Sequence, residues 1–321
     1  MKPVALVADL KFYPHEAISK LEARFDLIES KANNPRELSS ELSASDVEVY
    51  CCGLRIYVGE ELLKEAKTIR YLISPATGVN HLDLGYLASR NIEVIKLGDL
   101  KSQIQNVYAT AELAWGLIGA CARRLSSAVD SVISGNFDRT PFLGFELSGK
   151  TLGVVGFGRL GRQVAGYGNA FGMNVAVYET DMSKREAINP LQSVDSLREL
   201  LEISNVISVH VPLDKENKNF IDEKMISAIK LGSIFVNTSR GELVDEQALA
   251  AALRSGKLFG VGVDVLSGES DGNFSSLNSP LVQASRDGYN AIVTPHIGGW
   301  AENAVHLTRS LVIDEFLRKY Q

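Results

Sequence analysis

The segment that most constrains the fold lies near the middle of the chain, where three glycines separate a short apolar run from a helical pattern. Residues 151–161 read TLGVVGFGRLG, which places Gly156, Gly158 and Gly161 in G-x-G-x-x-G spacing. An apolar strand leads into this turn, a helix leads out, and a second strand, NVAVY, ends just before Glu179. This order of elements predicts a βαβ unit with two parallel strands.

The same alternation of strands and helices extends along the rest of the chain. It predicts an α/β protein with parallel, doubly wound sheets that helices cover on both faces. Because 321 residues exceed what one hydrophobic core usually serves, we expect two domains. The strands expected in the first hundred residues are 4–8, 25–30, 47–52, 69–74 and 92–96.

Two longer helices are also expected. Residues 108–133 form an apolar segment with hydrophobic side chains on more than one face, which predicts a long helix buried between domains or subunits. The final helix is expected at about Glu302 to Lys319. The segment 267–279, rich in serine, glycine and asparagine, is typical of a surface loop.

Composition excludes several classes of protein. A hydrophobic fraction of 45% and a charged fraction of 22% are typical of a soluble globular chain, and no apolar run is long enough to span a bilayer. The short apolar run before Asp9 indicates a first strand rather than a secretory signal. A net charge of −6 argues against a general nucleic-acid binder, so an anionic ligand would need local positive charge.

The cysteines indicate a cytoplasmic protein without a metal site. There are three, Cys51, Cys52 and Cys121, with no Cys-x-x-Cys pair and no histidine at metal-ligand spacing. This pattern disfavours both a disulfide framework and a zinc site. We expect buried, reduced thiols in a reducing compartment.

The glycine-rich turn predicts a dinucleotide site, because an acidic residue ends the second strand. Gly156 permits the tight turn, Gly158 lets the backbone approach a pyrophosphate, and Gly161 allows the helix to pack closely on the strand. A carboxylate at Glu179 accepts hydrogen bonds from ribose hydroxyls and repels a 2′-phosphate, which favours NAD over NADP. The residues expected to contact the cofactor here are Gly156, Gly158, Arg159, Leu160, Gly161 and Glu179.

Four further segments end predicted strands of the second domain. Since ligands of open parallel sheets bind at the carboxyl ends of strands, polar residues in these segments are expected to converge on one crevice. Those residues are Arg240, Asp264, Glu269 and His296. The segments are ISVHVPL at 207–213, GSIFVNTSRGELVDEQAL at 232–249, GVGVDVLSGE at 260–269 and IVTPHIGG at 292–299.

These segments, together with PATGVNHLDL at 75–84, resemble the D-2-hydroxyacid dehydrogenase family over nearly the whole chain. The similarity is greatest to its short, phosphoglycerate-dehydrogenase-like members. The resemblance implies a Rossmann NAD-binding domain, residues 101–291, inserted in a flavodoxin-like substrate domain formed by residues 1–100 and 292–321. It also implies NAD as the cofactor, a homodimer, and dimer contacts through the helix at 108–133.

The resemblance also implies catalytic roles that suit these residue types. Arg240 would bind the substrate carboxylate and polarise the 2-oxo group, because its planar fork matches a carboxylate. His296 would supply the proton during reduction and take it during oxidation, with Glu269 as the partner that orients the ring. The backbone N–H groups of Thr77, Gly78 and Val79 would bind the substrate carboxylate.

Further residues are implied to line the cofactor cleft. Asp264 would bind the nicotinamide carboxamide, and Gly298 and Gly299 would let the backbone lie close to the ring. His210 has a structural interpretation as well, because it precedes Val-Pro at a strand end. The implied set beyond the glycine-rich turn is His210, Val211, Pro212, Asn217, Thr238, Ser239, Asp264, Gly298 and Gly299.

Two departures from the family pattern leave alternatives open near the histidine. The family commonly places proline directly after the glutamate, whereas here Ser270 follows Glu269, so Asp271 is a rival partner for the ring. Trp300 stands where the family usually has a smaller residue; it would either narrow the pocket or pack on the partner domain.

Two residues of the first domain bear on the substrate. Arg55 lies where phosphoglycerate-type members carry phosphate-binding arginines, and a solvated loop charge is the alternative interpretation. His81 is interpreted as substrate-side lining only. The expected activity is therefore NAD-dependent oxidation or reduction of a small anionic 2-hydroxy or 2-oxo acid, with 3-phosphoglycerate and 3-phosphohydroxypyruvate among the candidates. The alternatives are a glyoxylate- or hydroxypyruvate-type reductase and a non-enzymatic, NAD-sensing dimer similar to a corepressor, with neither nucleic acid nor membrane as a partner.

Overall fold

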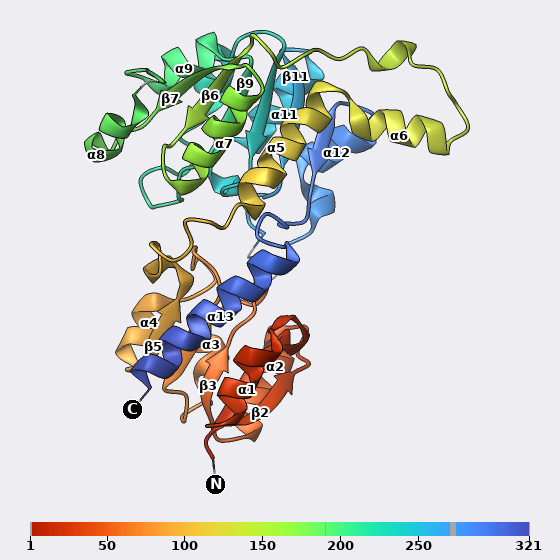
Figure 1. Cartoon of the computed structure of the whole chain (residues 1–321). Coiled ribbons are helices and arrows are strands. Elements are labelled where there is room, and N and C mark those ends of the chain that lie inside the picture. The colour runs from red at the N-terminus through yellow and green to blue at the C-terminus, as the bar shows by residue number, and fades with distance from the viewer. Residues whose placement is uncertain (1, 190, 270–273, 321) are drawn as a thin grey trace. The chain divides into compact units, whose positions relative to one another are not determined.

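The computed structural model describes residues 2–189, 191–269 and 274–320, which form two compact units. The first unit contains the chain up to Val107, together with Phe274 and the chain from Trp300 onward. The second contains Tyr108–Glu269 and Ser275–Gly299, so in chain order it is inserted within the first. Figure 1 shows the elements of each unit.

The unit boundaries differ from the expected ones at 100/101 and 291/292. Ile104 is buried in the core of the first unit, which keeps the segment after residue 100 there. The strand Ala291–Val293 pairs in parallel with its neighbour in the second sheet, and the N–H of His296 donates to the carbonyl of Asp264 at 2.9 Å. The segment 292–299 is therefore held in the second unit by backbone hydrogen bonds.

The first unit has a five-stranded parallel sheet in the order β2-β1-β3-β4-β5, which confirms the expected flavodoxin-like arrangement. Strand order reverses between β1 and β3, so the topological switch point of this sheet lies between these two strands. The strands are β1 Val4–Ala8, β2 Asp26–Ser30, β3 Val47–Cys51, β4 Tyr71–Ser74 and β5 Glu93–Lys96. The α-helices are α1 His15–Glu22, α2 Pro35–Ala44, α3 Glu60–Leu63, α4 Leu84–Ser89 and α13 Glu302–Lys319.

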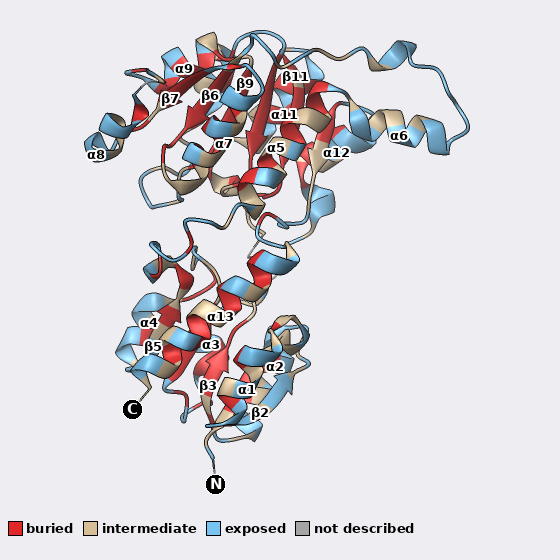
Figure 2. Ribbon diagram, in the orientation of Figure 1, coloured by how far each residue is buried: buried red, intermediate tan, exposed pale blue. Residues whose placement is uncertain are grey.

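Helices cover both faces of this sheet because its strands are apolar on both sides. Val7 and Ile73 face a core that α1 and α13 close, whereas Leu6 and Leu72 face a core closed by α2, α3 and α4. Figure 2 shows β3 as buried, whereas the edge strand β2 and the outer helix faces are largely exposed. Short polar side chains begin two of the helices: Asn34 accepts a hydrogen bond from the N–H of Glu37 in α2, and Asp83 caps α4 in the same way.

The second unit has a seven-stranded parallel sheet in the order β12-β11-β10-β9-β6-β7-β8, a Rossmann arrangement extended by one strand. Strand order reverses between β6 and β9. The strands are β6 Thr151–Val155, β7 Asn174–Tyr178, β8 Gln192–Ser193, β9 Val206–Val209, β10 Ser233–Asn237, β11 Leu258–Val263 and β12 Ala291–Val293. The α-helices are α5 Ala109–Ala122, α6 Leu125–Ile133, α7 Arg159–Ala170, α8 Met182–Arg185, α9 Leu197–Ile203, α10 Glu223–Ala228, α11 Glu246–Arg254 and α12 Pro280–Arg286.

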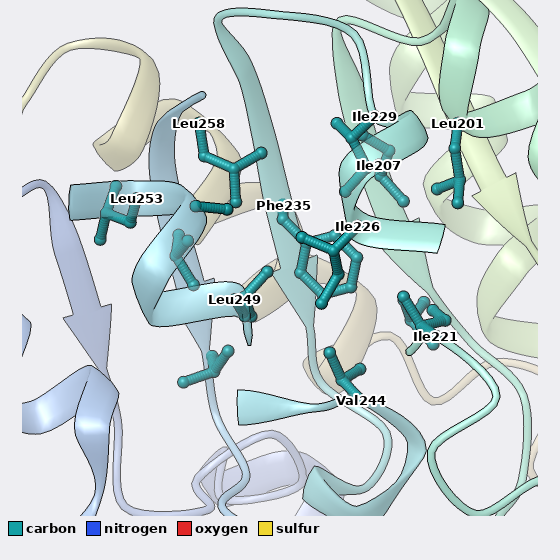
Figure 3. Close-up of a cluster of buried hydrophobic side chains, with 14 of the residues drawn as sticks. Leu201, Ile207, Ile221, Ile226, Ile229, Phe235, Val244, Leu249, Leu253 and Leu258 are labelled. Carbon is teal, nitrogen blue, oxygen red and sulfur yellow. The ribbon is translucent and has the colours of Figure 1, made fainter. Parts of the chain in front are cut away.

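The central strands of this sheet are buried on both faces. Figure 3 shows one of the two cores, where Phe235 of β10 lies among Ile207 of β9, Ile226 of α10 and Leu249 of α11. On the opposite face, Ile234 and Val236 of β10 belong to a separate core that includes α5 and α7. This burial fixes the register of the strands and therefore the positions of the residues that follow them.

The expected long helix at 108–133 is two helices, α5 and α6. Arg124 between them adopts a left-handed conformation with φ of 50°, which ends the helical path. The helix α5 is buried within the second unit itself, where it packs on α7 and β11. By contrast, α6 has no buried residue, and it extends away from the sheet together with the segment that follows it (Figure 1).

The cysteines agree with expectation. All three are free and buried, and burial raises the pKa of Cys52 and of Cys121 to about 12. Such thiols are protonated at neutral pH and chemically inert.

Candidate active site

A row of residues, each one position beyond the end of a strand, lines the carboxyl edge of the second sheet. The register pairs Val209 of β9 with Val155 of β6 and with Asn237 of β10, so these strands end level with one another. Ligands bind outside such an edge where strand order reverses, here between β6 and β9. The residues that directly follow the strands are Gly156, Glu179, His210, Thr238, Asp264 and Thr294.

The three glycines of the turn have distinct structural reasons. Gly156 has φ of 91°, and a β-carbon there would lie 2.7 Å from the Val211 side chain. A β-carbon at Gly161 would collide with the carbonyl oxygen of Gly156, so α7 can approach the turn only through a glycine. Gly158, the N-cap of α7, has nothing within 4 Å of a built β-carbon. The open space lies at a helix N-terminus, where a pyrophosphate would bind.

Arg159 and Leu160 form the first turn of α7, directly beyond this open position. Both side chains are partly buried. The backbone of this turn is therefore presented by a rigid helix.

Glu179 faces the glycine-rich turn from the end of β7. Its carboxylate accepts hydrogen bonds from the N–H of Phe157 at 2.8 Å and from those of Thr180 and Asp181 at 2.9 Å each. The residue is only 8% exposed. Because an ionised carboxylate has about four acceptor sites, these three bonds leave capacity for a ribose hydroxyl.

Two orphaned polar atoms lie at the ends of the neighbouring strands β9 and β10. Among the described residues, His210 Nδ1 and Thr238 Oγ1 are fully buried and make no hydrogen bond. His210 Nε2 lies 2.8 Å from Ser208 Oγ, and burial lowers the pKa of the ring to about 4, so the imidazole is neutral at pH 7. Unpaired buried polar atoms are rare in folded proteins, and their position fits a polar ligand at this edge.

Asn217 and Pro212 shape the loop that follows His210. Asn217 donates from Nδ2 to the Pro212 carbonyl at 2.8 Å and accepts from the N–H of Asp214 at 2.9 Å. Val211 packs beside Gly156. These contacts close the loop over the strand end, and the expected contacts of this loop with a cofactor remain a prediction.

Asp264 organises the loop that carries His296. Its buried carboxylate accepts hydrogen bonds from Thr294 Oγ1 at 2.6 Å, from Ile297 N at 2.8 Å and from Gly298 N at 2.7 Å. Burial raises the pKa of this carboxyl group, and the hydrogen bonds partly offset that effect. Asp264 therefore has a positioning role in addition to the cofactor contact that the sequence predicts.

His296 and Glu269 form a close pair. His296 Nδ1 lies 2.6 Å from Glu269 Oε1, and the other carboxylate oxygen accepts from the N–H of Leu266 at 3.3 Å. His296 itself has a left-handed backbone with φ of 54°. With Nδ1 engaged, Nε2 is the nitrogen left for another group. The rival partner Asp271 lies outside the described residues.

Arg240 follows Thr238 and Ser239 in the loop after β10. Its Nη1 donates to the Ser239 carbonyl at 2.6 Å, and Ser239 Oγ donates to the Val209 carbonyl at 2.9 Å. A β-carbon at Gly241 would collide with the backbone of Leu266, so the loop bearing Arg240 packs directly against the loop that leads to Glu269. Arg240, Glu269 and His296 thus belong to one packed set of loops.

Three residues that support these loops were not found from the sequence. Asn237 donates from Nδ2 to the Arg240 carbonyl at 2.8 Å and accepts from Ser239 N at 2.9 Å. Glu242 accepts from Gly268 N at 3.1 Å, and Glu246 accepts from Ser267 N at 2.5 Å. Asn237 and Glu242 flank the Thr-Ser-Arg-Gly segment in the chain, and this proximity could have indicated their supporting role from the sequence.

In the first unit, Thr77, Gly78 and Val79 follow β4 as a loop with free donors. Among the described residues, no group accepts a hydrogen bond from their three N–H groups. A β-carbon at Gly98 would lie 2.7 Å from the Thr77 carbonyl, so that residue supports the loop from behind. Free N–H groups on successive residues are available as donors to an anionic ligand.

Arg55 and His81 differ in their surroundings. Arg55 is 79% exposed at its side chain and lies 3.7 Å from Asp9. His81 is buried, with Nε2 3.4 Å from Ser74 Oγ and 3.8 Å from Cys52 Sγ. Its interpretation as substrate-side lining stays a prediction, with Nε2 placed beside Ser74 and Cys52.

Comparison with known proteins decides the family. The profile described as D-isomer specific 2-hydroxyacid dehydrogenase, NAD binding domain, matches residues 115–298. This chain belongs to that family. This chain is 32% identical to D-3-phosphoglycerate dehydrogenase of Methanocaldococcus jannaschii over 301 residues. The matched region covers 94% of this chain and 54% of that protein. It therefore spans about half the length of that relative.

Two further comparisons cover most of both chains. Glyoxylate reductase of Thermococcus gammatolerans is 32% identical to this chain over 308 residues, which cover 93% of this chain and 87% of the relative. The structure of D-lactate dehydrogenase from Aquifex aeolicus, complexed with NAD and lactic acid, has a TM-score of 0.78 at 28% identity, with 98% and 95% coverage. The expected family and fold class are thereby confirmed.

No helix in the described ranges has the length and apolar character needed to cross a membrane. Within the same ranges, no three histidine, cysteine, aspartate or glutamate side chains gather as metal ligands would.

Proposed function

We propose that this protein is an NAD-dependent dehydrogenase that transfers a hydride between nicotinamide C4 and C2 of a small 2-hydroxy or 2-oxo acid. The observation that carries the proposal is the 2.6 Å contact between His296 Nδ1 and Glu269 Oε1 at the carboxyl edge of the NAD-binding sheet. A ring held by a carboxylate beside a cofactor edge is the arrangement that a proton donor and acceptor requires. The three relatives named above are enzymes of such acids by name.

His296 would protonate the alkoxide oxygen at C2 during reduction and remove that proton during oxidation. Imidazole suits both directions because it gains and loses a proton near neutral pH. Glu269 accepts from Nδ1, which directs Nε2 to the substrate and stabilises the ring when it is charged. Asp264 holds the backbone on the far side of the histidine.

Arg240 would bind the substrate carboxylate and polarise the 2-oxo group. One of its five N–H donors is used by the Ser239 carbonyl, so a planar edge of the guanidinium remains available. The free N–H groups of Thr77, Gly78 and Val79 would bind the carboxylate as neutral donors. The substrate would thus be held by its acid group while C2 is left for the reaction.

NAD, when bound at the edge between β6 and β9, supplies the hydride acceptor or donor. The open position at Gly158 and the orphaned atoms His210 Nδ1 and Thr238 Oγ1 fit a large polar cofactor there. The carboxylate of Glu179 fits a ribose with free hydroxyls and disfavours a 2′-phosphate.

A panel of 2-oxo acids tests the activity. The purified protein with NADH is expected to oxidise NADH with at least one of glyoxylate, hydroxypyruvate, pyruvate and 3-phosphohydroxypyruvate, followed by NADH absorbance. The comparison of hydroxypyruvate with its phosphorylated form separates the phosphoglycerate-type substrate from the glyoxylate- or hydroxypyruvate-type. Tight NADH binding without turnover of any acid would contradict the proposal and favour an NAD-sensing protein.

A further inference from the structure

Arg309, in the C-terminal helix of the first unit, is a buried arginine with no hydrogen bond or ion pair to a described residue. The residue lies within α13 and is only 6% exposed. Among the described residues, no carboxylate forms an ion pair with it, and its Nε is fully buried without a hydrogen bond. Its two terminal nitrogens are not among the fully buried unpaired atoms, so the outer edge of the guanidinium still meets solvent.

Aromatic rings surround this guanidinium. Its central carbon lies 5.2 Å from the ring centre of Tyr13 and 5.5 Å from that of Trp300. Trp300 in turn packs edge-on against Phe12, with ring centres 4.8 Å apart. The rings interact with the positive charge, but they offer no acceptor to the N–H groups in the guanidinium plane. The donors that recognise a carboxylate or a phosphate are therefore unused.

A pocket beside the loop after β1 is lined by more cations than carboxylates, namely Lys11, Lys31 and Arg55 against Asp9 and Glu29. Asp9, the first residue after β1, has a left-handed backbone and already lies 3.7 Å from Arg55. Lys11 lies 5.0 Å from the Phe12 ring centre. Asp9 thus acts electrostatically on two cations, Arg55 and Arg309, near the ends of β1 and β3. These two strands form the switch point of the first sheet, where ligands of such sheets bind.

We propose that Arg309, covered by Trp300, binds a second anionic group of the substrate, a phosphate or a carboxylate beyond the acid group at C1. The inference rests on the proposed function, because it names the class of 2-oxo acid that the protein prefers. Arg309 remains charged at neutral pH even though burial lowers its pKa, and its planar edge matches either anion. Trp300 follows His296 by four residues, so the covering ring belongs to the same chain segment as the proton donor.

Anion binding can be measured without turnover, because the chain has only two tryptophans. In a Trp115→Phe protein, Trp300 fluorescence is expected to change saturably with inorganic phosphate at constant ionic strength held by potassium chloride. The change is expected to weaken at least about tenfold in apparent Kd when Arg309→Met is added. The control Arg318→Met removes an exposed arginine of the same helix and is expected to leave phosphate binding unchanged.

Substrate kinetics then distinguish phosphate from carboxylate. Arg309→Met is expected to raise KM at least about tenfold for the preferred dianion, either 3-phosphohydroxypyruvate or oxaloacetate, with less than threefold change in kcat and in KM for hydroxypyruvate. Arg309→Lys keeps the charge without the planar fork, so an intermediate KM is expected. If Arg309→Met does not fold, Arg309→Lys alone decides by the same comparison.

Failure of this inference is distinguishable from failure of the proposed function. Unchanged phosphate binding and unchanged KM ratios in folded Arg309 variants that still turn over 2-oxo acids would overturn the role of Arg309 alone. A phosphate response that depends on Arg309 in a protein without turnover would support the anion site and contradict the proposed activity. The absence of any saturable phosphate response in the Trp115→Phe protein, together with KM values for both dianions that Arg309→Met leaves unchanged, would overturn the inference.

Discussion

His296 is held in position by two acidic residues, Asp264 and Glu269, that do not themselves react. Asp264 fixes the backbone on both sides of Pro295 through Thr294, Ile297 and Gly298. Glu269 then holds the ring through Nδ1. A side chain fixed at its backbone and at its ring loses little freedom when a substrate binds, which is how a proton donor is kept ready.

Replacing the histidine tests its role directly. His296→Ala is expected to lower kcat by about 10²–10⁴-fold, the usual contribution of a general acid or base. NADH affinity is expected to survive, because the glycine-rich turn and Glu179 are untouched. The measurement is steady-state kinetics together with NADH fluorescence titration. An unchanged kcat, where the chemical step limits the rate, would contradict the assignment; His15→Ala on the exposed face of α1 is the control.

Glu179 governs the expected choice of cofactor. NADH is expected to have a lower KM than NADPH, since a carboxylate and a 2′-phosphate at contact distance repel by about 1 kcal/mol even in bulk water. Glu179→Gln removes the charge while keeping an acceptor for Phe157 N. The NADPH/NADH ratio of kcat/KM is expected to rise about fivefold or more, measured in parallel assays. A wild-type preference for NADPH would refute this role of Glu179.

His210 makes the stability of the fold depend on pH. Its pKa is about 4 in the folded protein against about 6.5 when exposed, so the unfolded chain binds more protons between these values. The free energy of unfolding is therefore expected to fall as pH drops from about 6.5 to about 4, with a loss of about 3 kcal/mol from this residue. Urea unfolding should show a flatter pH dependence for His210→Asn than for wild type, whereas His15→Gln should not. Parallel curves for wild type and His210→Asn would contradict the expectation.

Part of the candidate site followed from the sequence, and part did not. Arg240, Glu269 and His296 each stand in segments with a strand before them and a glycine within two residues, so their convergence on one edge was predictable. Asn237, Glu242 and Glu246 accept hydrogen bonds from backbone N–H groups, and the proximity of Asn237 and Glu242 to Arg240 in the chain was the sole sequence signal of such a role. The contact of His81 Nε2 with Ser74 was likewise not predictable from its motif.

At the scale of elements, the short apolar runs that alternate with helical patterns predicted both sheets, together with the glycine-rich turn. Buried parallel strands require such continuous apolar runs. The helix at 108–133 was predicted wrongly as one element, since Arg124 adopts φ of 50° although its residue type does not favour that conformation. The unit boundaries also depended on pairing: β12 joins β11, which carries residues up to Gly299 into the second unit. Local sequence does not encode either fact.

The glycine turn offers a contrast between two substitutions in one element. Gly158→Ala adds a methyl group into open space at a backbone conformation that alanine tolerates, so stability is expected to stay near that of wild type. NADH affinity is expected to fall by about tenfold, or about 1.4 kcal/mol, because the methyl group occupies the approach to the pyrophosphate. Gly161→Ala is the matched variant: its methyl group meets the Gly156 carbonyl, and overpacking of this kind costs about 1–3 kcal/mol of stability. Thermal unfolding and NADH titration of both proteins provide the test, and equal NADH affinity of Gly158→Ala and wild type would contradict it.

At the scale of the whole molecule, the apolar side chains of α6 and the segment after it have no cover within the described chain. Ile133 is 79% exposed, Phe137 is 93% exposed and Leu143 is 83% exposed. Exposed apolar side chains gathered on one protruding segment mark an interaction surface. Because α5 is buried within its own unit, the expected dimer contact moves from the whole segment 108–133 to α6 and residues 134–143.

A homodimer through this segment is the last expectation. Sedimentation velocity is expected to give a species of about twice 34.9 kDa for wild type. Phe137→Ser with Leu143→Ser removes the two most exposed apolar side chains of the segment, so the double variant is expected to sediment as a monomer, since hydrophobic burial drives such association. Leu231→Ser is the control, because Leu231 is similarly exposed at 73% but lies elsewhere in the second unit. A monomeric wild type would exclude the dimer. A double variant that stays dimeric would exclude this surface, because the dimer would then form without the two side chains that the surface exposes most.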